Sequence, residues 1–141
     1  MMVERQMSIK RIHHLNFVVE DLDDGIAQFE KILGSHVFEK DKLPQRGVVT
    51  ARARVGEQWF VLVQPTDFEL PPGRHLRERG EGFFLMSLEV DSMEDAVRDL
   101  ESKGVTFTSD MDRKGLLNWW VRDLGRDHAL GEQIQLCEER D

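Results

Sequence analysis

The feature that most constrains the fold is a unit that occurs twice along the chain. Residues 12–34 begin with an alternating apolar run, typical of a strand with one buried face, and continue with apolar residues at helical spacing that end at a glycine. Residues 85–104 repeat this order. A shift of 71 residues pairs apolar positions with apolar positions, namely Val19 with Val90, Leu22 with Met93, Ile26 with Val97 and Phe29 with Leu100. The chain therefore contains a duplication.

Each copy is followed by segments that predict three further strands. We expect these strands at 36–39, 48–55 and 58–64 in the first half, and at 105–108, 118–122 and 132–138 in the second. Residues 66–82 are rich in proline and glycine and are interpreted as a linker, with a short polar helical piece, HLRERG, at 75–80. The chain is thus expected to form one α+β domain, residues 1–141, from two tandem βαβββ modules at 10–65 and 83–138.

Composition restricts the classes of partner. The net charge of −8 argues against nucleic-acid binding and against a basic helix on a membrane surface, so small molecules or other proteins are the expected partners. The single cysteine, Cys137, cannot form an internal disulfide, and the first ten residues lack the apolar core of a signal peptide. No stretch approaches the length of a membrane span. We expect a cytoplasmic protein.

Three stretches carry a resemblance to a known family. They are IHHLNFVVEDLDDGIAQFEKILG at 12–34, HLRERGEGFFLMSLEVDSMEDA at 75–96 and GEQIQLCE at 131–138. With the duplication, they resemble the vicinal oxygen chelate superfamily, which includes glyoxalases, bleomycin-resistance proteins and dioxygenases, and most of all its methylmalonyl-CoA epimerases. The resemblance implies a cup-shaped mixed sheet with a divalent metal on the cup floor, held by one residue from each of four strands.

The four metal positions of that superfamily carry few ligands here. The resemblance places them at His14, Val61, Leu85 and Gln135. Two are aliphatic and one is a neutral amide, whereas a catalytic metal site usually has about three protein ligands. His14 and Gln135 are the only positions that keep a ligand-type side chain. We therefore expect no metal and no other cofactor.

Strand alternation predicts which other side chains would line the cup. If Gly56-Glu57 is a two-residue turn, Arg54 pairs with Trp59 and Arg52 with Val61, so both arginines face inward. Two guanidinium groups beside an indole describe a pocket for an anionic, partly apolar or aromatic ligand. The remaining expected lining comprises Asn16, Val18, Val63, Phe83, Leu85, Ser87, Glu89, Gln133, Gln135 and Cys137.

Several alternatives stay open. For Arg52 and Arg54 the alternatives are an exposed strand face, which a register shift of one residue would produce, or pairing with Glu89 and other acidic residues. Trp119 and Trp120 are adjacent, so one of them faces the cup, and the sequence does not say which. His13 is expected on the opposite face from His14, near a helix or the surface. Cys137 is expected to be a buried, inert thiol.

The sequence leaves three functions open. The first is a superfamily enzyme of isomerase, lyase or epimerase type that works without the usual metal, with His14 or Glu89 as acid or base. The second is a metal-free protein that binds or sequesters a small molecule, as in bleomycin resistance. The third is a divalent-metal-dependent lyase, epimerase or dioxygenase with displaced ligands, in which Glu57, Glu89 or a loop histidine supplies the missing ones. In each case the expected partner is a small anionic ligand, and the sheet edges left by two modules favour a homodimer.

Overall fold

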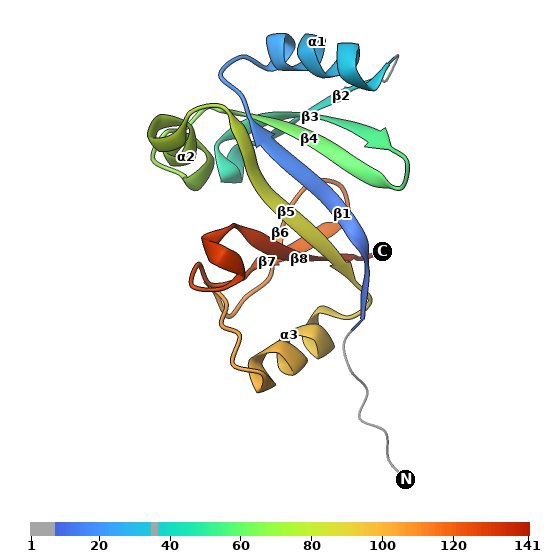
Figure 1. Ribbon diagram of the computed structural model, residues 1–141, viewed down its shortest axis with the longest axis vertical. Helices are drawn as coiled ribbons and strands as arrows, with labels where there is room; N and C mark the ends of the chain where they lie inside the picture. The colour runs from blue at the N-terminus through green and yellow to red at the C-terminus, as the bar shows by residue number, and fades with distance from the viewer. Residues whose placement is uncertain (1–7, 35–36) are drawn as a thin grey trace. The chain divides into compact units, whose positions relative to one another are not determined.

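The computed structural model describes residues 8–34 and 37–141 (Figure 1). Its helices and strands follow the order that the duplication predicts, with one additional helix, α2, in the segment interpreted as a linker. They are β1 (Ile9–Val18), α1 (Leu22–Leu33), β2 (Glu39–Leu43), β3 (Val48–Val55), β4 (Gln58–Pro65), α2 (Pro71–Arg79), β5 (Gly82–Val90), α3 (Met93–Ser102), β6 (Arg113–Lys114), β7 (Trp119–Asp123) and β8 (Ile134–Glu139), with 3₁₀ turns at Pro44–Arg46 and Ala129–Gly131.

The strands form one mixed sheet in the order β2-β3-β4-β1-β5-β8-β7-β6. Within each module the first strand pairs in parallel with the last, β1 with β4 and β5 with β8, and the other pairs are antiparallel. The strand order of the second module therefore mirrors that of the first. This repetition confirms the predicted α+β class and the tandem βαβββ arrangement.

The chain forms two compact units, which divide the first strand of each module between them. One unit is the continuous segment 14–85. The other combines the segment up to residue 13 with residues 86–141. Below, each unit is described by itself.

In the unit formed by residues 14–85, α1 covers one face of β3 and β4 (Figure 1). The Asp21 side chain accepts a hydrogen bond from the Asp24 backbone N–H at 2.8 Å, which satisfies one of the free donors of the first turn. Gly34, with φ of 84°, ends the helix. Leu22 packs against buried Leu62, and Ile26 and Phe29 complete the contact, as the apolar spacing predicts.

In the other unit, α3 repeats this arrangement against β5 and β8. The Ser92 hydroxyl accepts from the Asp95 backbone N–H at 3.1 Å, as the capping-box spacing indicates. Met93 and Val97 pack with Val90 and Leu136 in a buried cluster. The equivalent position of the cap, 71 residues after Asp21, shows that the duplication extends to local helix chemistry.

The second strand of each module lies later than the sequence predicted. β2 begins at Glu39, whereas the predicted strand begins at His36. His36 lies outside the described residues. The predicted strand 105–108 contributes only a bridge between Phe107 and Leu124, and β6 forms at 113–114, outside the strands that the sequence predicted. Both are edge strands, whose short polar sequences lack the alternation that marks a half-buried strand.

Candidate functional site

The face opposite α1 in residues 14–85 carries the predicted arginines. β3 pairs with β4 so that Arg54 lies opposite Trp59 and Arg52 opposite Val61, as the two-residue turn predicts. β1 joins the other edge of β4 with His14 opposite Trp59. Because partners in register share a face and Leu62 and Ala51 face α1, the following residues lie on the opposite face: His14, Asn16, Arg52, Arg54, Trp59 and Val61.

Arg52 is not available as an anion-binding fork. It is buried, its Nη2 donates to Glu39 at 2.7 Å, and its Nη1 donates to Asp41. Both acids belong to β2, the neighbouring strand on the same face. For Arg52 the alternative considered above, pairing with acidic residues, is therefore correct, and the two-arginine fork is not formed.

Arg54 differs from Arg52 although both lie on the same face. Its guanidinium carbon is 5.0 Å from the centroid of the Trp59 ring, a distance at which a cation is attracted to the ring face. The residue is exposed, and no carboxylate of the described chain lies within ion-pair distance of it. Arg54 is therefore a preoriented cation with unused hydrogen-bond donors.

The unit that contains Arg54 also has buried apolar and polar side chains. Val61 is 1% exposed and Leu85 2%, and His14 is also buried. The Asn16 Oδ1 atom is buried and has no hydrogen-bond partner among the residues that the structure describes. A buried amide oxygen of this kind costs free energy unless a partner satisfies it. Within the described residues, this face thus combines a cation without a carboxylate partner and an amide oxygen without a hydrogen-bond partner.

Phe83 does not lie where the sequence predicted. It is 40% exposed, and its ring is 6.0 Å from that of Phe17, at an interplanar angle of 81°. Phe17 packs with the α1 cluster and has its ring 5.1 Å from Phe29. The prediction that Phe83 stands beside Trp59 is therefore wrong, because edge-to-face packing holds its ring with the aromatic residues on the α1 side.

In the unit formed by the segment up to 13 and 86–141, the face opposite α3 carries Gln135 and its neighbours. Gln135 lies opposite Ser87 on β5 and Asp123 on β7. Its Nε2 donates to Asp123 Oδ1 at 3.0 Å, and Arg113 donates to the other oxygen of Asp123 at 2.5 Å. The Gln135 amide is therefore already engaged in a partly buried network.

Gln133 is engaged in the same unit. It accepts a hydrogen bond from Arg126 Nη1 at 2.6 Å, and its own carbonyl accepts from the Met86 N–H at 3.1 Å. The side-chain oxygen and the backbone carbonyl of Gln133 are thus both hydrogen-bonded within this unit.

Glu89 is buried and ion-paired. It lies opposite Cys137, accepts from Arg11 Nε, and has Lys10 Nζ 4.0 Å from one of its oxygens. Arg11 also donates to Glu139 Oε2 at 3.3 Å. A general base needs a lone pair within reach of a substrate proton, whereas here Arg11 occupies the carboxylate. This geometry weakens the prediction that Glu89 acts as acid or base.

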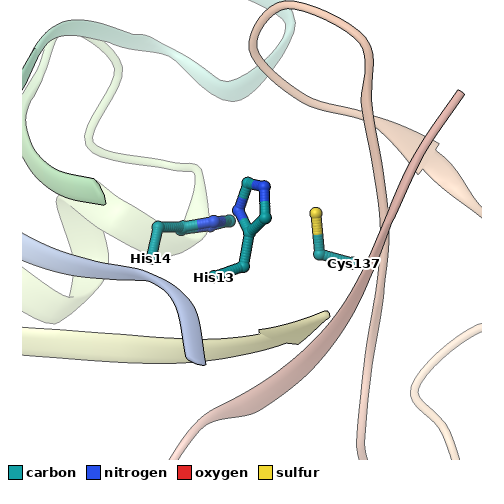
Figure 2. A group of neighbouring side chains, drawn as sticks. All are labelled: His13, His14 and Cys137. Atoms are coloured by element: carbon teal, nitrogen blue, oxygen red, sulfur yellow. The ribbon is translucent and has the colours of Figure 1, made fainter. Parts of the chain in front are cut away.

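His13 is fully buried, at 0% exposed, and not near a helix or the surface as predicted. Its Nε2 lies 2.6 Å from Glu139 Oε2, and its ring packs edge-on against Trp119 with centroids 4.6 Å apart. Burial lowers the pKa of His13, and the Glu139 carboxylate partly opposes this shift. Figure 2 shows His13 with Cys137 and with the next residue of β1, His14.

Cys137 matches its prediction as a buried thiol. Its side chain is inaccessible, and burial, reinforced by the charges of Glu139 and Glu89, raises its pKa to about 12.

The two adjacent tryptophans lie on opposite faces of this unit. Trp119 is buried on the face of Cys137, whereas Trp120 lies on the α3 side under the Arg140 guanidinium, 4.9 Å from its ring centroid.

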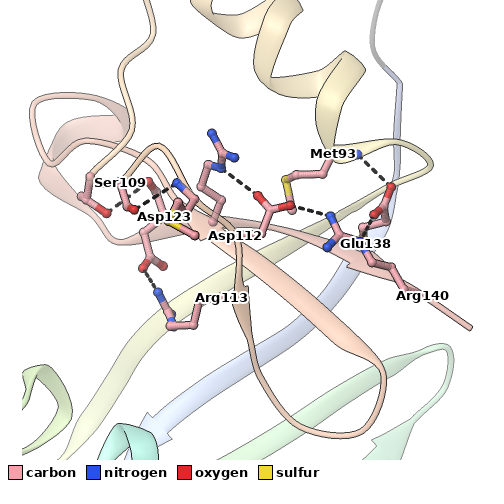
Figure 3. A network of polar contacts seen from close by, with 10 residues as sticks. Met93, Ser109, Asp112, Arg113, Asp123, Glu138 and Arg140 are labelled. Atoms are coloured by element: carbon pink, nitrogen blue, oxygen red, sulfur yellow. Dashed lines mark hydrogen bonds and ion pairs between the residues drawn. The ribbon is translucent and has the colours of Figure 1, made fainter.

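A polar network on the α3 side was not predicted (Figure 3). Asp112 accepts from Arg122 at 2.8 Å and from Arg140 at 2.5 Å, and Glu138 accepts from the Met93 backbone N–H at 2.9 Å. These groups border a pocket of about 540 Å³ next to α3. No motif marks them, because they are brought together from a loop, two strands and the chain end.

The four positions of the superfamily's metal site do not fit a metal here. Val61 and Leu85 offer no donor atom, and the Gln135 amide already donates to Asp123. His14 would then be the main ligand, and a single imidazole holds a divalent ion weakly.

Among the described residues, no helix has the length and hydropathy to cross a bilayer.

The chain is similar in sequence to a known protein superfamily. The model of the glyoxalase/bleomycin resistance protein/dioxygenase superfamily matches residues 13–122. Human mitochondrial methylmalonyl-CoA epimerase is 29% identical over 104 residues, which cover 73% of this chain and 59% of the epimerase. The uncharacterized protein YwkD of Bacillus subtilis is 25% identical over 99 residues, 70% of this chain and 76% of that protein. The chain thus spans about three fifths of the length of the human epimerase.

Solved structures share the fold. Methylmalonyl-CoA epimerase from Mycobacterium tuberculosis superposes with a TM-score of 0.89 at 23% identity, over 99% of this chain and 94% of that one. A Streptomyces coelicolor methylmalonyl-CoA epimerase variant in complex with 2-nitronate-propionyl-CoA gives 0.88 at 23% identity, over 95% and 100%. At this identity the likeness establishes the fold alone.

Proposed function

Because the chain belongs to the glyoxalase, bleomycin resistance protein and dioxygenase superfamily, we propose that it binds a small anionic, partly apolar molecule through the face of residues 14–85 opposite α1. The single observation that carries the proposal is Arg54, a cation fixed over Trp59 without a carboxylate partner in the described chain. A guanidinium of this kind recognises carboxylate or phosphate, and the indole beside it favours an apolar or aromatic portion of the ligand.

Acyl-CoA thioesters with a carboxylate are the first ligands to test. Solved structures of related epimerases hold methylmalonyl-CoA or 2-nitronate-propionyl-CoA. Arg54 suits an anionic acyl group, and the buried Asn16 Oδ1 would accept a hydrogen bond from a ligand that reaches it. In this proposal no metal takes part at the four superfamily positions, since Val61 and Leu85 cannot ligate one.

The experiment measures affinity for two matched ligands by calorimetry. Methylmalonyl-CoA carries the carboxylate and propionyl-CoA lacks it. Arg54→Ala should weaken binding of methylmalonyl-CoA by about tenfold, corresponding to about 1.4 kcal/mol, and should leave propionyl-CoA nearly unchanged. Arg77→Ala, an exposed arginine on α2, is the matched control. The proposal would be refuted if wild type and Arg54→Ala bound methylmalonyl-CoA with the same affinity and also bound propionyl-CoA with the same affinity.

Metal-free epimerisation is the second candidate, supported by the 29% identity to an epimerase. Epimerisation removes the proton α to the thioester and returns it to the other face, so it requires a base and stabilisation of the enolate. His14 is the base to test on the face that holds Arg54. Incubation with methylmalonyl-CoA in D₂O should give deuterium at the α-carbon by NMR if the chain is catalytic. Binding without exchange would leave sequestration as the function.

A further inference from the structure

Three ligand-type side chains meet on the face opposite α3, in the unit that does not contain Arg54. His13 on β1, Glu89 on β5 and Glu139 on β8 each offer one ligand atom, and these three atoms all lie within 4.8 Å of one another. His13 and Glu89 are buried, whereas Glu139 reaches solvent and gives an ion a path inward. None of the three occupies one of the four superfamily metal positions.

We propose that His13, Glu89 and Glu139 form a Zn²⁺ site. One imidazole nitrogen and two carboxylate oxygens are a donor set that Zn²⁺ accepts, with the fourth coordination position left to water. Mg²⁺ prefers oxygen ligands in octahedral geometry, and the imidazole disfavours it. The proposal is independent of the ligand-binding function above, because it uses other residues on another unit.

Arg11 holds the place of the ion. Its guanidinium donates to both Glu89 and Glu139, so a single positive charge joins the two carboxylates. A divalent cation at the same point would neutralise both carboxylates fully. Arg11 is partly exposed and can turn toward solvent when it is displaced. The site therefore exchanges a side-chain cation for a metal cation.

The geometry requires only small adjustments. Ligand atoms about 2.1 Å from a tetrahedral ion lie roughly 3.4 Å apart. The separations of up to 4.8 Å must shorten, and the 2.6 Å contact between His13 Nε2 and Glu139 Oε2 must open as the ion replaces the shared proton. Trp119 packs edge-on against the imidazole and fixes the plane of the ring during this change.

A purely structural ion-pair network would contain the same residues, and the Arg11 variant separates the two roles. If the network is only structural, Arg11→Gln destabilises the protein and has no effect on zinc. If the network is a metal site, Arg11→Gln removes the competing cation and tightens zinc binding. The two roles thus predict different results in one measurement.

The test is equilibrium dialysis of the full chain, freed of metal with EDTA, against Zn²⁺ alone and against Mg²⁺ alone. Wild type should bind one Zn²⁺ per chain in preference to Mg²⁺. Glu139→Gln should weaken the affinity for Zn²⁺ by at least about tenfold. Glu138→Gln is the matched control, the same substitution one residue away on the other face, where Glu138 pairs with Arg140. It should leave zinc affinity unchanged.

Arg11→Gln should bind Zn²⁺ several times more tightly than wild type, with a larger rise in melting temperature on adding zinc. His13→Gln should lose the site, and Glu139→Gln answers the question if the buried His13 variant does not fold. Equal zinc affinity in wild type, Glu139→Gln and Glu138→Gln would overturn the proposal. So would the absence of bound zinc in both wild type and Arg11→Gln.

Discussion

The two faces opposite α1 and α3 differ more than the two helices do. On the first face Arg54 lies over Trp59, and no carboxylate of residues 8–34 and 37–141 pairs with it. On the second, Arg11 lies between Glu89 and Glu139, so one positive charge is paired with two carboxylates. The helices, in contrast, keep equivalent caps and equivalent buried stripes. Duplication has preserved what the core requires, and the opposite faces have diverged in charge.

The largest expected effect tests whether the two helix-facing cores are equivalent. Leu62→Ala and Leu136→Ala each remove a fully buried side chain from the cluster under α1 or α3. Each should lower the free energy of unfolding by about 3 kcal/mol, within the range of 2–5. Urea denaturation measures both. A cost below about 1 kcal/mol in only one variant would show that the two cores do not contribute equally.

The next effect sharpens the difference between the opposite faces, because Cys137 lies on the second one. The pKa of Cys137 in the folded chain, about 12, is above the ordinary thiol pKa of 9.0, so between these values the unfolded chain loses a proton that the native chain keeps. The free energy of unfolding should therefore fall as the pH rises above 9, by about 1.4 kcal/mol per pH unit at most. Urea melts of wild type and Cys137→Ala at pH 8 to 10.5 give the contrast. Identical slopes for the two proteins would contradict the prediction.

The caps test the equivalence of the helices at a smaller scale. Asp21→Ala and Ser92→Ala each remove one hydrogen bond to the first turn, at positions 71 residues apart. Each should cost about 1 kcal/mol. The control is Gln28→Ala, an exposed change in the middle of α1. If the control costs as much as Asp21→Ala, the loss is not due to capping.

The smallest effect concerns acid. The pKa of His13 is lowered from 6.5 in the native state, so as the pH falls below 6.5 the unfolded chain takes up a proton before the native chain does. Stability should decline over this interval and should be unaffected by His13 at higher pH. Melting temperatures from pH 8 to 5 in EDTA, for wild type and His13→Gln, measure the difference. A wild-type curve parallel to that of the variant would exclude this role of His13.

Local patterns predicted the helices and the buried strands well. The stripe from Leu22 to Phe29 and the turn at Gly56-Glu57 act between neighbours in sequence, so the chain itself defines them. Strand alternation also placed Arg52 and Arg54 on the correct face. What alternation could not predict was the partner of each guanidinium, since β2 forms later than expected and brings Glu39 and Asp41 to Arg52 alone.

His13 was misplaced for a different reason. Alternation within β1 assigns it to the face opposite His14, and only its partners on distant strands, Trp119 and Glu139, reveal where it packs. A signal for Glu139 was present, because it follows Cys137 by two residues and must share its face. Strand alternation could thus predict that Glu89 and Glu139 share a face with Cys137, but not that His13 joins them. The contribution of β1 required the structure.

The division of β1 has a consequence for the order in which the chain can fold during synthesis. Residues 14–85 are continuous and can pack as soon as they have left the ribosome. Arg11 and His13 are made earlier, yet their partner Glu139 lies 128 and 126 residues further on, near the end of the chain. Closing so long a loop comes late, because its entropy cost precedes any gain from the contact. β1 is thus synthesised before β8, and its contacts with Glu139 form only after β8 has been made.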